Sequence, residues 1–468
     1  MHARRLAALV ALCAALATTV AFLLGPQIGV VVHAQSAPLA VQAPLPVGWP
    51  LAFELGFADS PGGAAALRQT APFAFRYQYL AGGVNTGTGW STWNPGGDFV
   101  RFYIEDSVAN GVIPVFPYYM LLQSIPGGGS ESDANFTNLN TTATMTAYYN
   151  DLKLFFQKAG AFPTRRVVLH VEPDFWGFMQ QRASSDDAAT VTAKVSETGL
   201  PELQGLPGNV SGFARAIVAL RNTYAPNVIL GYHLSVWGTM VDIALQNPTD
   251  AEVDALALRA AAFYRSLNAS LDIVFAEFSD RDSGYYQFVV GDNGRSWWDA
   301  EDFRRNARFL GGFATSAMRR IVMWQIPMGN TRMRAQNNTW GHYQDNRTEW
   351  LLDEPARSRL TAYRDAGVVA LLFGGGADGT TCACDARNDG VTSPAPIGAN
   401  TIASQLTSPG TPPSLTTVGG TPTLMTPYAA NDDGGYLRWR AWQYYQVGAM
   451  PLPGTHPPSS PRNLHFVR

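Results

Sequence analysis

The chain has 468 residues and a formal net charge of −3, and charged residues make up only 15% of it. A near-neutral chain of this kind produces no strong electrostatic field that would attract nucleic acid or anionic lipid, which argues against both as partners. Aromatic residues reach 12%, including 12 Trp. A composition poor in charge and rich in Trp, Tyr and Gly suits an extracellular protein that binds neutral polar ligands such as sugars.

The N-terminus has the layout of a secretory signal peptide. Arg4 and Arg5 precede the uncharged run Leu6–Leu24, and small residues around Ala34 offer a cleavage site. We therefore expect residues 1–34 to be removed on export, which leaves a secreted protein with no membrane association. An uncleaved membrane anchor is the alternative, because the apolar run approaches the length of a bilayer span.

Beyond the leader, apolar runs alternate with helical patterns. Eight runs predict strands at Leu51–Gly56, Phe73–Tyr79, Val112–Tyr119, Arg166–Glu172, Val228–Leu234, Ile273–Phe278, Ile321–Ile326 and Val368–Phe373. Helices are predicted at Met145–Ala159, Phe213–Tyr224, Glu252–Leu267, Asp302–Ser316, Arg357–Asp365 and Gly435–Val447. Near-continuous apolar strands are typical of a parallel sheet that is buried on both faces. Eight strand–helix units favour an α/β fold with a single (β/α)8 TIM-type barrel over residues 35–449 and long loops after the strands.

The C-terminal segment and the cysteines lie outside this repeat. Residues 450–468 are rich in Pro and Ser, and Pro457–Leu464 resembles the opening of a fibronectin type III-like module, so we expect a linker or the remnant of such a module. Cys382 and Cys384 have a C-x-C spacing that allows one small disulfide in an exported protein. Two free thiols are the alternative.

Metal and cofactor motifs are weak in this sequence. Asp385–Gly390 resembles a calcium-binding loop, but Arg387 takes a ligand position and no Glu completes the loop. We predict no cofactor and no metal, with structural Ca²⁺ as the alternative, and we expect a monomer. The chain has no H-E-x-x-H zinc motif and no G-x-S-x-G nucleophile elbow, and the loop Phe57–Gly63 after the first predicted strand lacks the G-x-G-x-x-G order of a phosphate loop.

Carboxylates gather at the expected carboxyl ends of the strands, where barrels of this type carry their chemistry. His170 and Glu172 end the fourth predicted strand and, two residues apart, are expected to face the same way. A fixed Glu next to Asp174 and aromatic rings can have a raised pKa and act as a general acid. Glu277 emerges from the sixth strand and is the expected second carboxylate. A structural Glu172, tied to an Arg or to the backbone, is the alternative.

Other side chains at the strand ends are suited to stacking on sugar rings or to hydrogen bonding with hydroxyls. The predicted substrate-binding residues are Glu54, Arg76, Tyr77, Tyr118, His170, Trp176, His233, Trp237, Asp280, Trp324 and Gln325. Structural roles compete at three of them. Glu54 and Arg76 can form an ion pair, and Asp280 can belong to a solvated loop with ion pairs.

The strand-four motif resembles two groups of enzymes. Glu172 with Pro173 resembles the large clan of retaining (β/α)8 glycoside hydrolases that includes cellulases and mannanases. That resemblance implies an acid/base at Glu172 and a nucleophile at the end of strand seven, where this chain has Gln325; Val171 replaces the clan's Asn. Glu172-Pro173-Asp174 also resembles the E-P-D of the inverting cellobiohydrolase and endoglucanase family, which implies that Asp174 is the proton donor.

We therefore predict a secreted glycoside hydrolase that cleaves a polysaccharide with paired carboxylates, Glu172 or Asp174 together with Glu277. A carboxyl separation of about 5–5.5 Å would indicate a retaining enzyme, and one of about 6.5–9.5 Å an inverting enzyme. A non-catalytic extracellular barrel that binds glycan is the main alternative, and Gln325 favours it. A polysaccharide lyase or another hydrolase is the third possibility.

Overall fold

The computed structural model describes residues 40–41, 43–278, 282–330, 343–375 and 436–454. The predicted signal peptide, Asp280, the cysteine pair Cys382 and Cys384, and the calcium-like loop lie outside the described residues. Among the described residues, no helix combines the length and the apolar character needed to cross a membrane.

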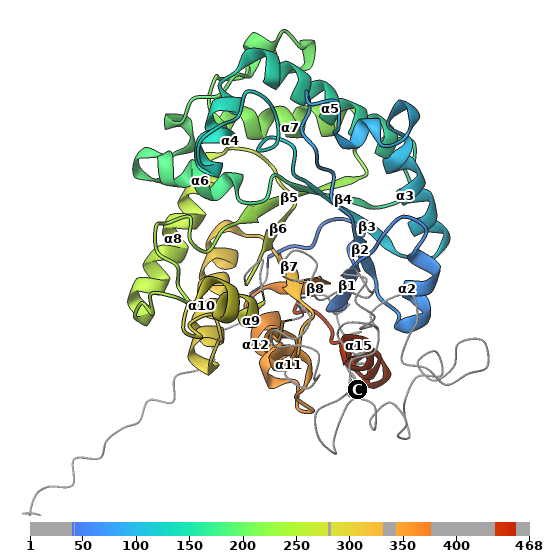
Figure 1. Ribbon diagram of the computed structural model, residues 1–468, viewed down its shortest axis with the longest axis vertical. Coiled ribbons are helices and arrows are strands. Elements are labelled where there is room, and N and C mark those ends of the chain that lie inside the picture. Colours follow the sequence, from blue (N-terminus) through green and yellow to red (C-terminus); the bar gives the residue numbers. More distant parts are fainter. Residues whose placement is uncertain (1–39, 42, 279–281, 331–342, 376–435, 455–468) are drawn as a thin grey trace, which may run out of the picture. The chain divides into compact units, whose positions relative to one another are not determined.

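Eight parallel strands pair in sequence order and close into a barrel at the centre of the fold (Figure 1). The strands are β1 (Glu54–Ala58), β2 (Phe75–Tyr77), β3 (Ile113–Tyr118), β4 (Val167–Val171), β5 (Val228–Leu234), β6 (Ile273–Ala276), β7 (Ile321–Pro327) and β8 (Val368–Gly374). Closure comes from pairing of β8 with β1, in which Glu54 is in register with Ala370. The predicted (β/α)8 fold is confirmed.

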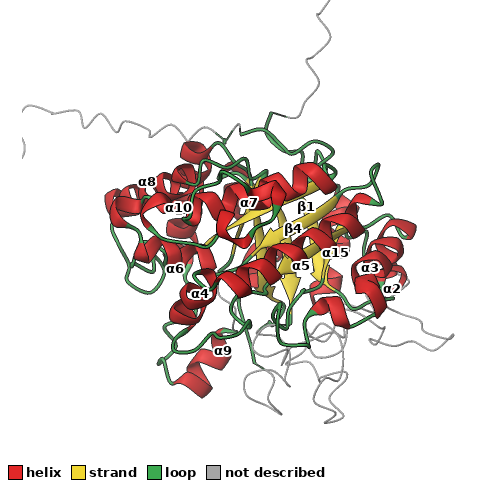
Figure 2. Cartoon of the chain, turned by 90° about the horizontal axis from the view of Figure 1, so that it is seen from above, coloured by secondary structure: helices red, strands yellow, loops and turns green. Residues whose placement is uncertain are grey.

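Helices enclose the barrel on its outside (Figure 2). They are α2 (Ala64–Thr70), α3 (Asp98–Ala109), α4 (Glu131–Leu139), α5 (Thr142–Gly160), α6 (Phe175–Arg182), α7 (Val210–Tyr224), α8 (Asp250–Ser266), α9 (Ser283–Tyr285), α10 (Ala300–Ala317), α11 (Arg347–Leu352), α12 (Ser358–Asp365) and α15 (Tyr436–Val447). The apolar faces of the sheet and of these helices form one continuous buried core. This packing explains why the strand sequences are almost uninterrupted in apolar residues.

The floor of the barrel, at the amino ends of the strands, is covered by both ends of the described chain. Ala52 pairs with Pro451, and the Phe53 amide donates to the Met450 carbonyl. The guanidinium of Arg320 donates to backbone carbonyls on both segments. Residues 450–454 thus pack on the barrel, so the boundary expected at residue 450 falls inside a segment that belongs to the barrel floor.

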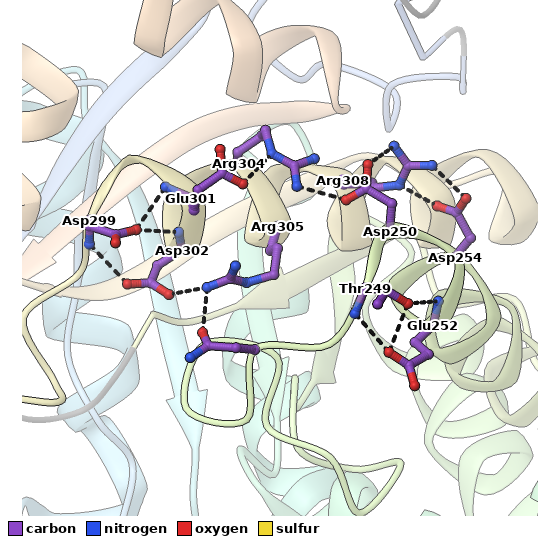
Figure 3. A network of polar contacts seen from close by, with 11 residues as sticks. Thr249, Asp250, Glu252, Asp254, Asp299, Glu301, Asp302, Arg304, Arg305 and Arg308 are labelled. Carbon is purple, nitrogen blue, oxygen red and sulfur yellow. Dashed lines mark hydrogen bonds and ion pairs between the residues drawn. The ribbon is translucent and has the colours of Figure 1, made fainter. Parts of the chain in front are cut away.

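Charged side chains tie the outer faces of α8 and α10 together (Figure 3). Both helices begin with a capping box, at Thr249 and at Asp299. Arg304 and Arg308 of α10 both pair with Asp250 of α8. Exposed pairs of this kind contribute little individually, so the network orients the two helices more than it stabilises the fold.

Strand β7 has a bulge near its carboxyl end. Met323 pairs with Leu371 and Ile326 pairs with Phe373, so Trp324 and Gln325 together stand opposite one residue of β8. Gln325 accordingly has a φ of 53°, in the left-handed region. Bulges bend a strand and redirect its side chains, and they are frequent next to active sites.

Candidate active site

Asp174 is presented by a tight turn after β4. The Phe175 amide donates to the Pro173 carbonyl at 2.8 Å, which makes Asp174 the central residue of a γ-turn. Its φ of 66° and ψ of −34° are rare for a residue with a side chain. This γ-turn conformation is strained, and strained backbone persists where the surrounding structure holds it, often at functional sites. The turn leaves the Asp174 carboxylate partly exposed at the carboxyl ends of the strands.

His233 lies on β5 and is fully buried. Its Nδ1 is 3.0 Å from Nε2 of His170, and the two nitrogens share one hydrogen bond. The His170 ring stacks on Phe275 of β6 with a centroid distance of 4.1 Å, which fixes both imidazoles inside the barrel. Burial lowers the pKa of His233 to about 3, so this imidazole is neutral at any ordinary pH. Its Nε2 is 3.7 Å from Asp174 Oδ1.

Glu277 follows directly after β6 and completes a group of three. One carboxylate oxygen of Asp174, one of Glu277 and one ring nitrogen of His233 lie within 4.8 Å of one another. We call Asp174, His233 and Glu277 the mouth cluster. Its members come from the ends of three consecutive strands, which is where barrels of this class bind and transform their ligands.

Aromatic residues line the mouth beside this cluster. The Tyr79 hydroxyl donates to Gln325 Oε1 at 2.7 Å. Tyr79 also packs on Trp324 with a centroid distance of 5.7 Å, and Trp324 in turn contacts Tyr77 and His170. Burial, reinforced by nearby acidic groups that include Glu277, holds the pKa of Tyr79 well above its usual range. Tyr79 therefore remains a hydrogen-bond donor.

A cavity of about 320 Å³ adjoins Glu277 between the loops that follow β5 and β6. Its lining combines aromatic and charged side chains, chiefly Trp237, Asp242, Phe278, Tyr286, Arg295 and Trp298. The volume lies at the lower end of the range of about 300–1,000 Å³ that is usual for small-ligand sites. Aromatic rings beside polar groups suit the apolar face and the hydroxyls of a sugar ring.

Glu172 lies outside the mouth cluster, in contrast to the expectation that it can be one of the two catalytic carboxylates. Its φ of 43° breaks the alternation of the strand, so it does not share the orientation of His170. The side chain is fully buried, and its carboxyl accepts hydrogen bonds from the amides of Met120 and Leu121. Burial raises the pKa of Glu172 to about 8, although these two amides act in the opposite direction. The geometry corresponds to the structural alternative.

Arg76 and Glu54, both predicted to bind substrate, also point out of the barrel. Arg76 is fully buried and pairs with Asp59 at 2.7 Å while it packs against α3. Glu54 accepts a hydrogen bond from the Tyr445 hydroxyl of α15 at 2.9 Å. The alternative, a pairing of Glu54 with Arg76, is also not observed, because each side chain contacts a different helix.

Tyr118 and Trp176 lie in the layer between sheet and helices rather than at the mouth. The Tyr118 hydroxyl donates to Asp151 of α5 at 2.6 Å, and the Trp176 indole donates to the Val171 carbonyl at 2.8 Å. Both side chains are fully buried. Neither can stack on a substrate unless the helical layer opens.

Two residues of the mouth, Tyr79 and Tyr119, are not among the predicted substrate-binding residues. Tyr119 packs edge-on against Tyr79 and donates its hydroxyl to Glu131 at 2.6 Å. The alternation of the strand could have identified Tyr79, because it lies two residues after Tyr77 and continues the same face. The predicted residues that the structure does bring together at or under the mouth are Tyr77, His170, Asp174, His233, Trp237, Glu277, Trp324 and Gln325.

Comparison with known proteins gives similarity only at the level of structure. No protein-family profile matches the chain, and no curated protein matches its sequence. A xyloglucan-specific β-1,4-glucanase of the GH5 class from a ruminal metagenomic library is 12% identical over 85% of this chain and 89% of its own, with a TM-score of 0.44.

Two further structures are similar to this chain to a comparable degree. The exo-β-1,4-mannosidase Op5Man5 from Opitutaceae bacterium strain TAV5 is 9% identical over 87% of this chain and 62% of its own, with a TM-score of 0.43. GH26C from Muricauda sp. MAR_2010_75 is 11% identical over 69% of this chain and 79% of its own, with a TM-score of 0.40. Identities this low transfer no activity, so the function has to be inferred from the site itself.

Proposed function

We propose that this protein is an exported glycoside hydrolase in which Asp174 and Glu277 act on the two sides of the scissile bond. The observation that carries the proposal is the convergence of these two carboxylates within 4.8 Å at the carboxyl ends of β4 and β6. Glycosidic bond cleavage requires such a pair, one carboxyl to protonate the leaving oxygen and one to attack or to activate water. Export is supported by the leader-like residues 1–34.

The short separation favours a retaining mechanism. Retaining enzymes hold the two carboxyl groups about 5–5.5 Å apart, whereas inverting enzymes need about 6.5–9.5 Å to admit a water. One oxygen of Asp174 and one of Glu277 are at most 4.8 Å apart, which is closer to the retaining spacing than to the inverting one. In the first step the ionised carboxylate attacks the anomeric carbon while the protonated one gives its proton to the leaving oxygen. In the second step water, deprotonated by the same acid/base group, releases the sugar.

The residues around the pair suit a neutral sugar. The cavity next to Glu277 presents Trp237 and Tyr286, whose faces can stack on a pyranose ring. Tyr79 and Gln325 place a hydroxyl and an amide in the mouth, near the pair. These groups exchange hydrogen bonds with sugar hydroxyls without requiring charge on the ligand. We therefore expect the substrate to be a polysaccharide or an oligosaccharide.

A glycan-binding barrel without activity is the second candidate, and Gln325 is the observation that favours it. Gln325 takes the strand-seven position at which the retaining clan named above has its nucleophile, and an amide cannot attack an anomeric carbon. In the hydrolase proposal the missing carboxylate is supplied by the neighbouring strand β6, through Glu277. The two candidates differ in whether bound glycan is cut.

The test is a panel of neutral polysaccharides and aryl glycosides incubated with the wild type, Asp174→Asn and Glu277→Gln. We expect cleavage by the wild type with retention at the anomeric carbon, and loss of cleavage in both variants. Sodium azide assigns the roles. A variant that lacks the nucleophile yields a glycosyl azide of inverted configuration, and a variant that lacks the acid/base yields one of retained configuration.

Three outcomes decide between the candidates. Binding of a glycan without cleavage by the wild type supports the non-catalytic barrel. Cleavage that survives in both variants shows that the hydrolytic site lies elsewhere. Cleavage with inversion removes the retaining mechanism but leaves the carboxylate pair in place. The matched control is Asp254→Asn, which changes an exposed carboxylate on α8 that pairs with Arg308 and does not line the cavity.

A further inference from the structure

The mouth cluster has the chemistry of a metal site in addition to that of an acid/base pair. We propose that Asp174, His233 and Glu277 bind one divalent transition-metal ion in the free protein. Two carboxylate oxygens and one imidazole nitrogen lie within 4.8 Å of one another, at the ends of three consecutive strands. The inference concerns binding by the resting protein, and it stands or falls independently of the proposed hydrolysis.

The decisive observation is the hydrogen bonding of the buried His233 ring. This side chain is fully buried, yet its Nε2 has no hydrogen-bond partner within the described part of the chain. The same atom faces Asp174, with Oδ1 at 3.7 Å. A buried polar nitrogen without a partner costs free energy, so a group that satisfies it is expected. A metal ion between Nε2 and the carboxylates would do so.

The other nitrogen of His233 is held as metal-binding histidines usually are. His233 Nδ1 is 3.0 Å from His170 Nε2, and His170 is clamped between Phe275 and Trp324. When the shared proton sits on His233 Nδ1, the Nε2 lone pair points to the carboxylates. A partner on the second ring nitrogen fixes the orientation and tautomer of a ligating imidazole. Here the partner is a second histidine in place of the more common carboxylate or carbonyl.

The spacing needs only a small adjustment to hold an ion. Two ligands that are each about 2.1 Å from a tetrahedral ion lie roughly 3.4 Å from each other. The separation of 3.7 Å between His233 and Asp174 is already close to that value. The wider spacing, at most 4.8 Å, exceeds the same value by about 1.4 Å. Exposure of Asp174 also leaves a path by which an ion can enter.

The donor set selects the class of metal. Neutral imidazole combined with carboxylates suits Zn²⁺ and Mn²⁺, whereas Mg²⁺ and Ca²⁺ prefer sites made only of oxygen ligands. Because the ion would engage the lone pairs of both Asp174 and Glu277, it would occupy the groups that the proposed hydrolysis needs. Bound metal and glycan cleavage are therefore mutually exclusive, and the metal acts as a reversible blocker of the site.

The test is titration calorimetry of the purified, chelator-treated protein with Zn²⁺ and Mn²⁺, with Mg²⁺ and Ca²⁺ for comparison. We expect one Zn²⁺ per chain and at least a tenfold loss of affinity in His233→Phe, which keeps a ring packed against His170 and Trp324. Glu277→Gln should cause a similar loss. Asp242→Asn, a carboxylate of the adjoining cavity outside the cluster, should bind like the wild type. Thermal melting verifies that each variant is folded.

The results separate this inference from the hydrolase proposal. No Zn²⁺ binding, or binding of equal strength in the wild type, His233→Phe and Glu277→Gln, overturns the metal site whether or not glycans are cut. If His233→Phe does not fold, the Glu277→Gln result decides. One-to-one binding that depends on the cluster supports the site even when the wild type cuts no glycan. Where the wild type does cut, Zn²⁺ at its measured Kd should halve the rate, and a chelator should restore it.

Discussion

Two carboxylates at the end of β4, only two residues apart, occupy opposite environments. Glu172 is fully buried against the amides of Met120 and Leu121, on the side of the sheet that faces α5. Asp174 is partly exposed at the mouth, next to His233. Pro173 stands between them, and both flanking residues have positive φ angles of 43° and 66°. The turn therefore sends consecutive acidic side chains to different sides of the barrel wall.

The difference shows that a raised pKa by itself does not locate an active site. Burial raises the pKa of Glu172 to about 8, a value that would suit a general acid. The same burial removes Glu172 from contact with any ligand in the mouth. Asp151, behind the same wall, follows the same pattern, because it is buried with a raised pKa and accepts hydrogen bonds from Trp90 and Tyr118. Accessibility to substrate distinguishes Asp174, the proposed catalytic group, from Glu172.

The largest expected difference between Asp174 and Glu172 is in how strongly their substitution lowers activity. Asp174→Asn should lower kcat/KM by about 10²–10⁴-fold, the usual contribution of an acid/base or nucleophilic carboxylate. Glu172→Gln should leave kcat/KM close to the wild-type value, because the side chain does not reach the mouth. Steady-state kinetics on the best substrate of the panel measures both. A large loss of activity in a folded Glu172→Gln variant would reverse the assignment of the two carboxylates.

The next largest difference is expected between the wild type and Glu172→Gln, in how stability depends on pH. The pKa of Glu172 is raised from 4.5 to about 8 in the folded state, so folding favours the protonated form. Its contribution to stability is complete below about pH 4.5 and is lost as the pH rises through about 8. Glu172→Gln has no proton to lose, so the wild type should weaken relative to it by a few kcal/mol across this window.

Urea denaturation of both proteins at pH 5, 7 and 8.5 gives the two stability curves. The curves should diverge as the pH rises, with the variant becoming the more stable relative to the wild type. Parallel curves would mean that Glu172 titrates near its ordinary pKa, and hence that the side chain is open to water.

The smallest contrast is between two tryptophans near the site. Trp237 lines the cavity next to Glu277, whereas Trp176 is fully buried and donates to the Val171 carbonyl. Trp237→Ala should weaken glycan binding roughly tenfold and leave the melting temperature nearly unchanged. Trp176→Phe leaves the buried carbonyl without its donor and should lower stability by about 1–3 kcal/mol with little effect on KM. Calorimetric melting and glycan titration on both variants measure the two effects, and an exchange of the two results would contradict the placement of these side chains.

The sequence predicted the barrel well because its information is local and repeated. Each strand is a short apolar run, such as Val228–Leu234 or Val368–Gly374, whose every residue is buried in the closed sheet. The predicted ends of the strands were less accurate. The fourth strand ends at Val171, one residue before the predicted end, and that single residue changed the orientation expected for Glu172.

The sequence alone was enough to predict an α/β barrel and a site at the strand ends, with Glu277, His233 and Asp174 among its members. Tertiary structure decided which polar side chains meet, because β4, β5 and β6 become neighbours only through parallel pairing, and Tyr79 after β2 meets Gln325 of β7 only in the closed barrel. Tertiary structure also decided the roles of Arg76, Tyr118 and Trp176, which are satisfied by α3, α5 and the backbone. Periodicity describes the face of a regular strand, and it fails where a positive φ turns the chain, as at Glu172 and Asp174.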